Sequence, residues 1–161
     1  MPRTTRICAL ALLTVATAAA CAPAVSVRVA EHAADPVCSD VVLALPDELG
    51  TYPRLRTTSQ ATTAWGDPAT PIVLRCGVEP PGPTTDTCVT ATDDAGTGVD
   101  WIAIEGPVAA DGGATWTFTT YGREPAVEVT VPPEVTRDSS TAFLVDLAPA
   151  VNKSPQLRSC V

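Results

Sequence analysis

The sequence predicts an α+β domain with one antiparallel sheet of about four or five strands, two helices on one face of the sheet, and two disulfides. Apolar residues recur at helical spacing near both ends of the domain, in 35–50 and 138–154. Between these segments, from residue 54 to residue 131, short runs alternate apolar with polar residues, and Pro and Gly separate them. Four of the six cysteines fall within 35–161, which we take as a single domain.

The first helix is predicted over 35–50 because this segment has the expected start and stop residues. Asp35 can cap the first turn, and Pro36 suits the first helical position, where no N–H is needed. Pro46 and Gly50 end or kink the helix. Apolar residues fall on one helical face at Val37, Val41 and Leu45.

Strands are predicted where the apolar residues alternate. In the last of these runs Val127, Val129 and Val131 point one way, while Glu128 and Thr130 point the other, as in a half-buried antiparallel strand. The loops between strands are rich in Pro, Gly and Asp. The predicted strands cover 71–76, 99–104, 114–121 and 126–131.

A second helix is predicted over 138–154. Asp138 or Ser139 can cap it. Pro149 interrupts a continuous helical pattern. The apolar stripe consists of Phe143 or Leu144, then Leu147 and Val151.

The first twenty residues predict a secretory signal peptide over 1–20. Arg3 and Arg6 give a positive start, an apolar stretch over 7–16 follows, and small alanines precede Cys21. The apolar stretch is shorter than the roughly 20 residues that a membrane span needs. We therefore expect the chain to be exported.

Cys21 is the predicted lipid-attachment residue, because its surroundings resemble a bacterial lipobox. Once Cys8 leaves with the signal peptide, five cysteines remain, and a lipid on Cys21 leaves an even number for disulfides. The alternative is that Cys21 is incidental to the cleavage region and the protein is secreted. A doubly acylated chain would sit on the outer face of the cytoplasmic membrane. Residues 21–34 would form a tether, and 25–29 would be an edge strand or an extended linker.

The remaining cysteines allow three pairings. Cys76 and Cys88 flank a Pro/Gly loop between two predicted strands, so a local bridge is easy and leaves Cys38 to pair with Cys160. We expect both bridges to be structural, because no C-x-x-C motif is present and the spacings do not suit zinc. The sequence thus predicts no metal and no cofactor.

The charge of the exported chain argues against nucleic acid as a partner. All 18 acidic residues remain after cleavage and two of the 10 basic residues are lost, which gives 8 − 18 = −10. Because no basic patch offsets this charge, binding to nucleic acid is not expected.

Residues for catalysis are few. His32 is the single histidine and is expected to be a solvated linker residue, and no G-x-S-x-G motif presents a nucleophile. Asp93, Asp94 and Asp100 are the candidates for a carboxylate pair such as a glycosidase uses. The alternative, which we prefer, is a solvated turn that precedes a strand.

The three tryptophans are either core residues or platforms for sugar rings. In a domain so poor in aromatic residues, Trp116 is expected in the core, whereas Trp65 and Trp101 are left open.

Several stretches together resemble a family of small actinobacterial lipoproteins that is catalogued as a domain of unknown function, number thirty-five fifteen in that series. These stretches are AWGDPATPIVLRCGV, GVDW, FTTYGREPAVEVTVP, FLVDLAP and the cysteine near the C-terminus. The resemblance implies a signal peptide, a lipobox cysteine and four further cysteines, which match Cys38, Cys76, Cys88 and Cys160. It implies no activity.

The motif around Gly122 is the part of this resemblance that has no obvious core role. A hairpin turn at Gly122 explains most of it. Arg123 would otherwise form a surface ion pair with Glu124 or bind an anionic group. Trp101, Tyr121 and Arg123 are therefore the residues of a possible binding surface.

These observations favour an exported, lipid-anchored, non-catalytic protein that binds another envelope protein or a cell-wall component. The alternative is an envelope hydrolase that acts on cell-wall glycan through a carboxylate pair.

Overall fold

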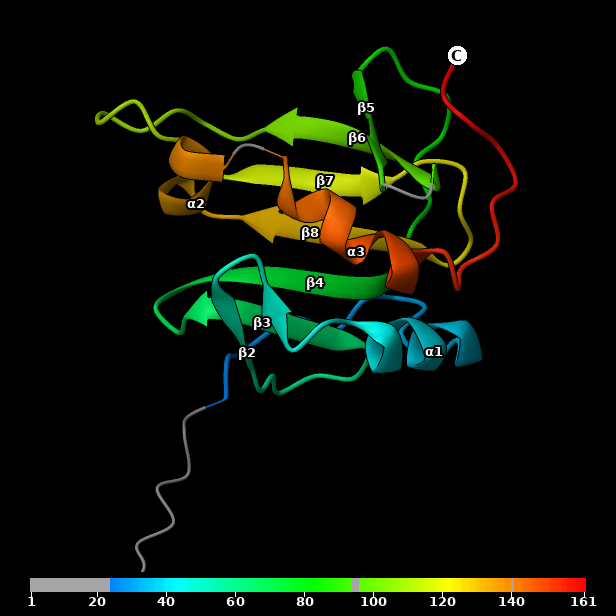
Figure 1. Cartoon of the computed structure of the whole chain (residues 1–161), viewed down its shortest axis with the longest axis horizontal. Helices are drawn as coiled ribbons and strands as arrows, with labels where there is room; N and C mark the ends of the chain where they lie inside the picture. Colours follow the sequence, from blue (N-terminus) through cyan, green and yellow to red (C-terminus); the bar gives the residue numbers. More distant parts are fainter. Residues whose placement is uncertain (1–23, 94–95, 140) are drawn as a thin grey trace, which may run out of the picture.

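The computed structural model describes residues 24–93, 96–139 and 141–161, and within these residues the chain forms three helices and one sheet of eight strands (Figure 1). The sheet consists of two antiparallel meanders that meet where β4 pairs with β8, in the order β1-β2-β3-β4-β8-β7-β6-β5. The strands are Glu48–Leu49 (β1), Tyr52–Leu55 (β2), Thr62–Asp67 (β3), Thr70–Val78 (β4), Thr87–Thr92 (β5), Gly98–Glu105 (β6), Trp116–Thr120 (β7) and Ala126–Val131 (β8). The helices are Pro36–Ala44 (α1), Pro133–Ser139 (α2) and Phe143–Val151 (α3).

The α+β class with two disulfides is confirmed, but the prediction of four or five strands is wrong. The four predicted runs form β4, β6, β7 and β8, and the other four strands lack a clear alternating pattern. β1 has two residues, and β2 contains Pro53, which sequence rules place outside strands or at their edges. β3 is buried on both sides from Thr62 to Trp65, so its sequence does not alternate.

The core lies between one face of the sheet and the helices α1 and α3. Register places Leu74 opposite Val129 and Phe118 opposite Val129 on the other side, so these side chains share a face. Leu144, Leu147 and Val151 of α3 are fully buried against the sheet and α1, as the apolar stripe predicts. The large fully buried side chains include Trp65, Trp101, Leu49, Ile72, Leu74 and Val127.

The helices begin where their caps and prolines allow. Asp35 accepts a hydrogen bond from the Val37 N–H at 2.8 Å, which confirms the predicted start of α1. The second predicted helix, over 138–154, corresponds to α3, which begins only at Phe143, after the expected caps; α2, which begins at Pro133, is a third helix that was not predicted. Pro149 lies inside α3, so it did not end this helix as its ring often does.

The disulfides pair Cys38 with Cys76 and Cys88 with Cys160, so the expected bridges Cys76–Cys88 and Cys38–Cys160 are wrong. The Cα atoms lie 5.5 and 6.5 Å apart in the two observed bridges. Cys76 lies on β4 and Cys88 on β5, with β8, β7 and β6 between them. Four strand spacings amount to about 19 Å, which is far beyond the reach of a disulfide. Adjacency in sequence was misleading because residues 79–86 cross the sheet.

The segment that leads into α1 packs against the domain. Val25 forms a single parallel bridge with Thr57, through hydrogen bonds from the Val25 N–H to the Arg56 carbonyl and from the Thr58 N–H to the Val25 carbonyl. Val27, Ala30 and Ala33 are buried. This pairing is shorter than the edge strand that was one of the two alternatives for 25–29.

The signal peptide over 1–20 and Cys21 lie outside the described residues, so export and lipid attachment stay predictions. Among the residues that the structure describes, no helix is long and apolar enough to cross a membrane.

The disulfide pairing can be checked by digestion with endoproteinase Asp-N without reduction. The enzyme cleaves before aspartate and separates all four cysteines, into peptides 35–39, 67–85, 86–92 and 146–161. The structure predicts that 35–39 is linked to 67–85 and that 86–92 is linked to 146–161. Mass spectra that show 67–85 linked to 86–92 would contradict the fold.

Candidate functional site

Arg123 belongs to the interior and not to a binding surface, so the proposal of a surface at Trp101, Tyr121 and Arg123 is not supported. Arg123 is 4 % exposed, and its guanidinium donates hydrogen bonds to the Ser154 carbonyl and to Asn152 Oδ1. Trp101 is fully buried, and Tyr121 is half-buried. Arg123 therefore has neither of its two expected roles, which were a surface ion pair with Glu124 and the binding of an anionic group.

The motif around Gly122 holds the C-terminal tail against the sheet. Gly122 has a φ of +69°, and a Cβ there would overlap the backbone of Arg158. The Gly122 carbonyl accepts hydrogen bonds from the N–H groups of Leu157 at 2.6 Å and Arg158 at 3.2 Å. The tail then reaches Cys160, which is bonded to Cys88. The predicted turn is confirmed, and its second purpose is to fasten the tail.

A buried carboxylate accompanies this arginine. Burial lowers the pKa of Arg123, and the nearby charge of Asp100 raises it again. Asp100 is 8 % exposed and accepts hydrogen bonds from Thr90 Oγ1 at 2.7 Å and from the Cys160 N–H at 2.9 Å. Asp100 therefore fastens the tail too, which leaves it little freedom to act on a substrate.

Asp93, Asp94 and Asp100 were the candidates for a carboxylate pair. Asp94 lies outside the described residues. Asp93 closes the turn between β5 and β6, where it accepts a hydrogen bond from the Thr97 N–H at 2.7 Å. The turn that was preferred for these residues is therefore present at Asp93, whereas Asp100 is buried in a strand.

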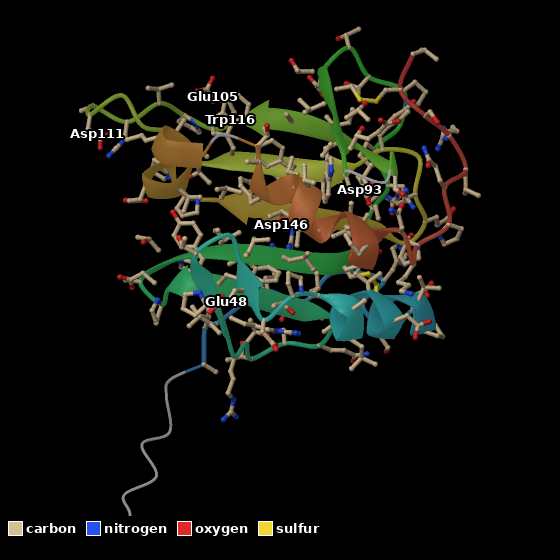
Figure 2. The ribbon with its side chains drawn as sticks, viewed as in Figure 1. Glu48, Asp93, Glu105, Asp111, Trp116 and Asp146 are labelled. Atoms are coloured by element: carbon tan, nitrogen blue, oxygen red, sulfur yellow. A yellow bond between two sulfur atoms is a disulfide. The ribbon has the colours of Figure 1, made fainter. Side chains whose placement is uncertain are left out.

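Asp93 also lines a shallow hollow with carboxylates that the sequence did not connect. Glu48 of β1 and Asp146 of α3 are its other acidic residues, and Pro46 and Pro149 form part of its wall (Figure 2). The hollow has a volume of about 650 Å³.

An apolar pocket of about 300 Å³ lies on the helix-covered face of the sheet. Its floor is aromatic, because the rings of Trp116 and Phe118 stack with centroids 6.1 Å apart and planes 17° apart. Strands β5, β6 and β7 supply the floor, while α2 and Thr141, two residues before α3, supply one side. The lining residues are Thr87, Val89, Ala103, Trp116, Phe118, Thr136 and Thr141.

The pocket exists because one row of the sheet carries small side chains. Ala103 lies between Thr87 on one neighbouring strand and Phe118 on the other. Two residues earlier on β6, on the same face of the sheet, the corresponding side chain is Trp101. Trp101 is fully buried, and α3 packs over this part of the sheet. Because Ala103 has only a methyl group where Trp101 in the neighbouring row has an indole ring, a hollow is left above Ala103.

One carboxylate stands beside the pocket. Glu105 stands directly opposite Trp116 in the register of β6 and β7, so both side chains share this face (Figure 2). Glu105 is exposed, whereas Trp116 is half-buried, so the expectation that Trp116 is a core residue holds only in part.

The loop between β6 and β7 is fixed to α2 beside the pocket. Arg137 forms an ion pair with Asp111 at 2.6 Å. The Gly113 N–H and, next, the charge of Arg137 lower the pKa of Asp111. Thr136, one residue before Arg137, is therefore held at the pocket wall.

Comparison with known proteins identifies the family of this chain. A family model described as "Protein of unknown function (DUF3515)" matches residues 4–159. The chain belongs to the DUF3515 family. This confirms the resemblance, although the match says nothing about actinobacteria or lipid attachment. No curated protein and no solved structure matches the chain significantly.

Sequence analysis of this DUF3515 chain missed the pocket because part of its lining comes from a strand and a helix that the sequence did not show. Thr87 and Val89 lie on β5, and Thr136 lies on α2, neither of which was predicted. The one usable signal was Trp116, which stands at the beginning of a predicted strand next to a long polar loop.

Arg123→Ala should lower the free energy of unfolding by about 2 to 4 kcal/mol, because it leaves the Ser154 carbonyl and Asn152 Oδ1 without their donor and removes a charge near the buried Asp100. Urea denaturation of the disulfide-bonded protein measures this change. Arg137→Ala is the matched control, since its ion pair is exposed and should leave the midpoint nearly unchanged. Equal midpoints for all three proteins would show that Arg123 is not a structural residue.

Proposed function

We propose that this chain is an exported, lipid-anchored, non-catalytic envelope protein that binds another envelope protein through the pocket beside Trp116. The observation that carries the proposal is the pocket itself, with its aromatic floor and open side. A pocket of this size suits one apolar side chain, and a single buried anchor of this kind supplies much of the affinity of many interfaces.

The lining of the pocket favours binding over chemistry. The described lining residues are four apolar side chains and three threonines. The threonine hydroxyls at its edge can hydrogen-bond to the backbone of a bound segment. Proton transfer at neutral pH needs groups such as histidine or a carboxylate. Binding of an apolar anchor therefore uses every feature of the pocket.

Charge complementarity argues for a partner segment with a basic residue beside its apolar anchor. Glu105 stands next to Trp116 on the same face, and the whole chain carries a formal charge of −8. Such a field attracts cationic partners and repels acidic ones. A partner protein whose exposed segment has an aromatic or aliphatic residue next to Lys or Arg fits both the pocket and its rim.

The disulfides support the lipid anchor. Both bridges use cysteines within the domain, and Cys21 is left over once Cys8 is removed with a signal peptide. In an oxidising compartment a lone thiol is reactive, and thioether attachment to diacylglycerol removes it.

The alternative function, a hydrolase for cell-wall glycan, needs a different set of residues from the one first considered. Asp100 is buried under the C-terminal tail, so the acidic hollow of Glu48, Asp93 and Asp146 would have to supply the carboxylate pair. Asp93 is already engaged with the Thr97 N–H, which makes this hollow a weaker candidate than the apolar pocket.

Lipid attachment should be visible in the intact mass of the protein from its native host. The expected mass exceeds that of the chain from Cys21 to Val161 by a lipid group, and no free thiol reacts with a maleimide. Cys21→Ser should move the protein from the membrane fraction to the medium. A plain mass with one labelled thiol would overturn the anchor.

The pocket can be tested with a displayed library of random short peptides, selected on the immobilised protein. Enriched peptides should contain an aromatic or aliphatic residue next to Lys or Arg. A synthetic peptide from the selection should bind Trp116→Ala about tenfold more weakly or worse, measured by fluorescence anisotropy. Glu105→Gln should weaken binding mainly at low salt.

Two further variants keep this test decisive. Thr87 is exposed at the rim, so Thr87→Arg should obstruct the pocket without affecting the core. Leu43 is 83 % exposed on α1, away from the pocket, and Leu43→Ala should bind like the wild type. Selection of peptides that bind all four variants equally would exclude the pocket, and competition by wall-glycan fragments alone would favour a sugar ligand instead.

A further inference from the structure

Three potential metal ligands meet at the end of the sheet opposite the Trp116 pocket. Glu31, His32 and Glu79 each offer one ligand atom, and these atoms lie within 4.8 Å of one another. His32 Nε2 is 3.3 Å from Glu79 Oε2. The histidine was expected to be a solvated linker residue, yet a residue 47 positions away in sequence contacts it.

The backbone fixes this meeting point independently of the side chains. The His32 N–H donates to the Gly77 carbonyl at 2.8 Å, and the Asp35 N–H donates to the His32 carbonyl at 3.0 Å. Gly77 has a φ of +88°, and a Cβ there would lie 2.7 Å from the Ala33 nitrogen. Only glycine permits this close crossing of two chain segments. Because Glu79 follows two residues later, the crossing places it beside His32.

The surroundings are suited to a cation. A pocket of about 500 Å³ next to His32 and Glu79 also includes Asp35, Glu124 and the single basic residue Arg158 in its described lining. The described lining thus holds the three carboxylates of Asp35, Glu79 and Glu124, and Glu31 lies beside His32 outside it. Asp35 is engaged as the cap of α1, so Glu124 or water is the available further ligand.

We propose that Glu31, His32 and Glu79 bind one Zn²⁺ ion, with water or Glu124 in the remaining position. Imidazole nitrogen together with carboxylate oxygen is a donor set that zinc accepts. Two tetrahedral ligands about 2.1 Å from zinc lie about 3.4 Å apart, which the His32–Glu79 pair already approaches. Both side chains are accessible, with His32 52 % exposed and Glu79 78 % exposed, so the ion can enter directly from solvent.

Zinc at this point would fasten the segment that follows Cys21 to the end of β4. Residues 25–33 are also attached through the Val25–Thr57 bridge, hydrogen bonds of Val27 with Thr58 and Ser59, the His32–Gly77 hydrogen bond and buried small side chains. The ion would therefore limit how the domain moves relative to an anchored N-terminus. This consequence rests on the proposed lipid anchor, whereas zinc binding itself does not.

The single histidine makes the test direct. The exported chain, purified without a histidine tag and treated with a chelator, is titrated with ZnCl₂ while the imidazole signals are followed by NMR. We expect these signals to shift until one equivalent is bound. Calorimetry should give one site, and His32→Gln and Glu79→Gln should each weaken it about tenfold or more.

Matched variants separate the site from general binding to an acidic surface. Glu134→Gln removes an exposed carboxylate on α2 and should leave the affinity unchanged. Glu31→Gln tests the third ligand and should weaken binding as the other two do. Unshifted imidazole signals at one equivalent, or equal affinity in His32→Gln and wild type, would show that His32 and Glu79 form an ordinary ion pair only.

Discussion

The buried guanidinium of Arg123 is the constraint on which the end of this structure depends. An arginine cannot lose its proton in a protein, so once it is 4 % exposed its donors must find acceptors nearby. Its two terminal nitrogens find them in the turn after α3, at Asn152 and Ser154, whereas its Nε has no hydrogen-bond partner among the described residues. The same turn carries Ser154 Oγ, which donates to the Pro125 carbonyl at 2.7 Å. The direction of the C-terminal tail follows from these contacts.

With the tail fixed, the two disulfides act on different parts of the fold. Cys38–Cys76 joins α1 to the middle of the sheet, and Cys88–Cys160 joins the edge strand β5 to the tail. The entropy of loop closure makes each bridge worth about 4 kcal/mol against the unfolded chain. The helices cover one face of the sheet as far as the row of side chains that contains Trp101. The next row, which contains Ala103, is left open and forms the pocket.

The sequence predicted the parts of the fold that have a regular local pattern. Asp35 and Pro36 marked α1 correctly, and the valines of β8 marked a half-buried strand. It could not predict β3, whose buried residues have no alternation, or the disulfides, which depend on strand order. Arg123 was misjudged for the same reason, because only the position of the tail decides whether a charged residue in a turn is covered.

The two proposed sites occupy opposite ends of the strands, and this separation bears on function. Trp116 pairs with Val131 at one end of the sheet, whereas Ala126 and Val78 pair at the end near His32. A partner bound at the Trp116 pocket would therefore not cover His32, so the two proposed sites can be occupied at the same time.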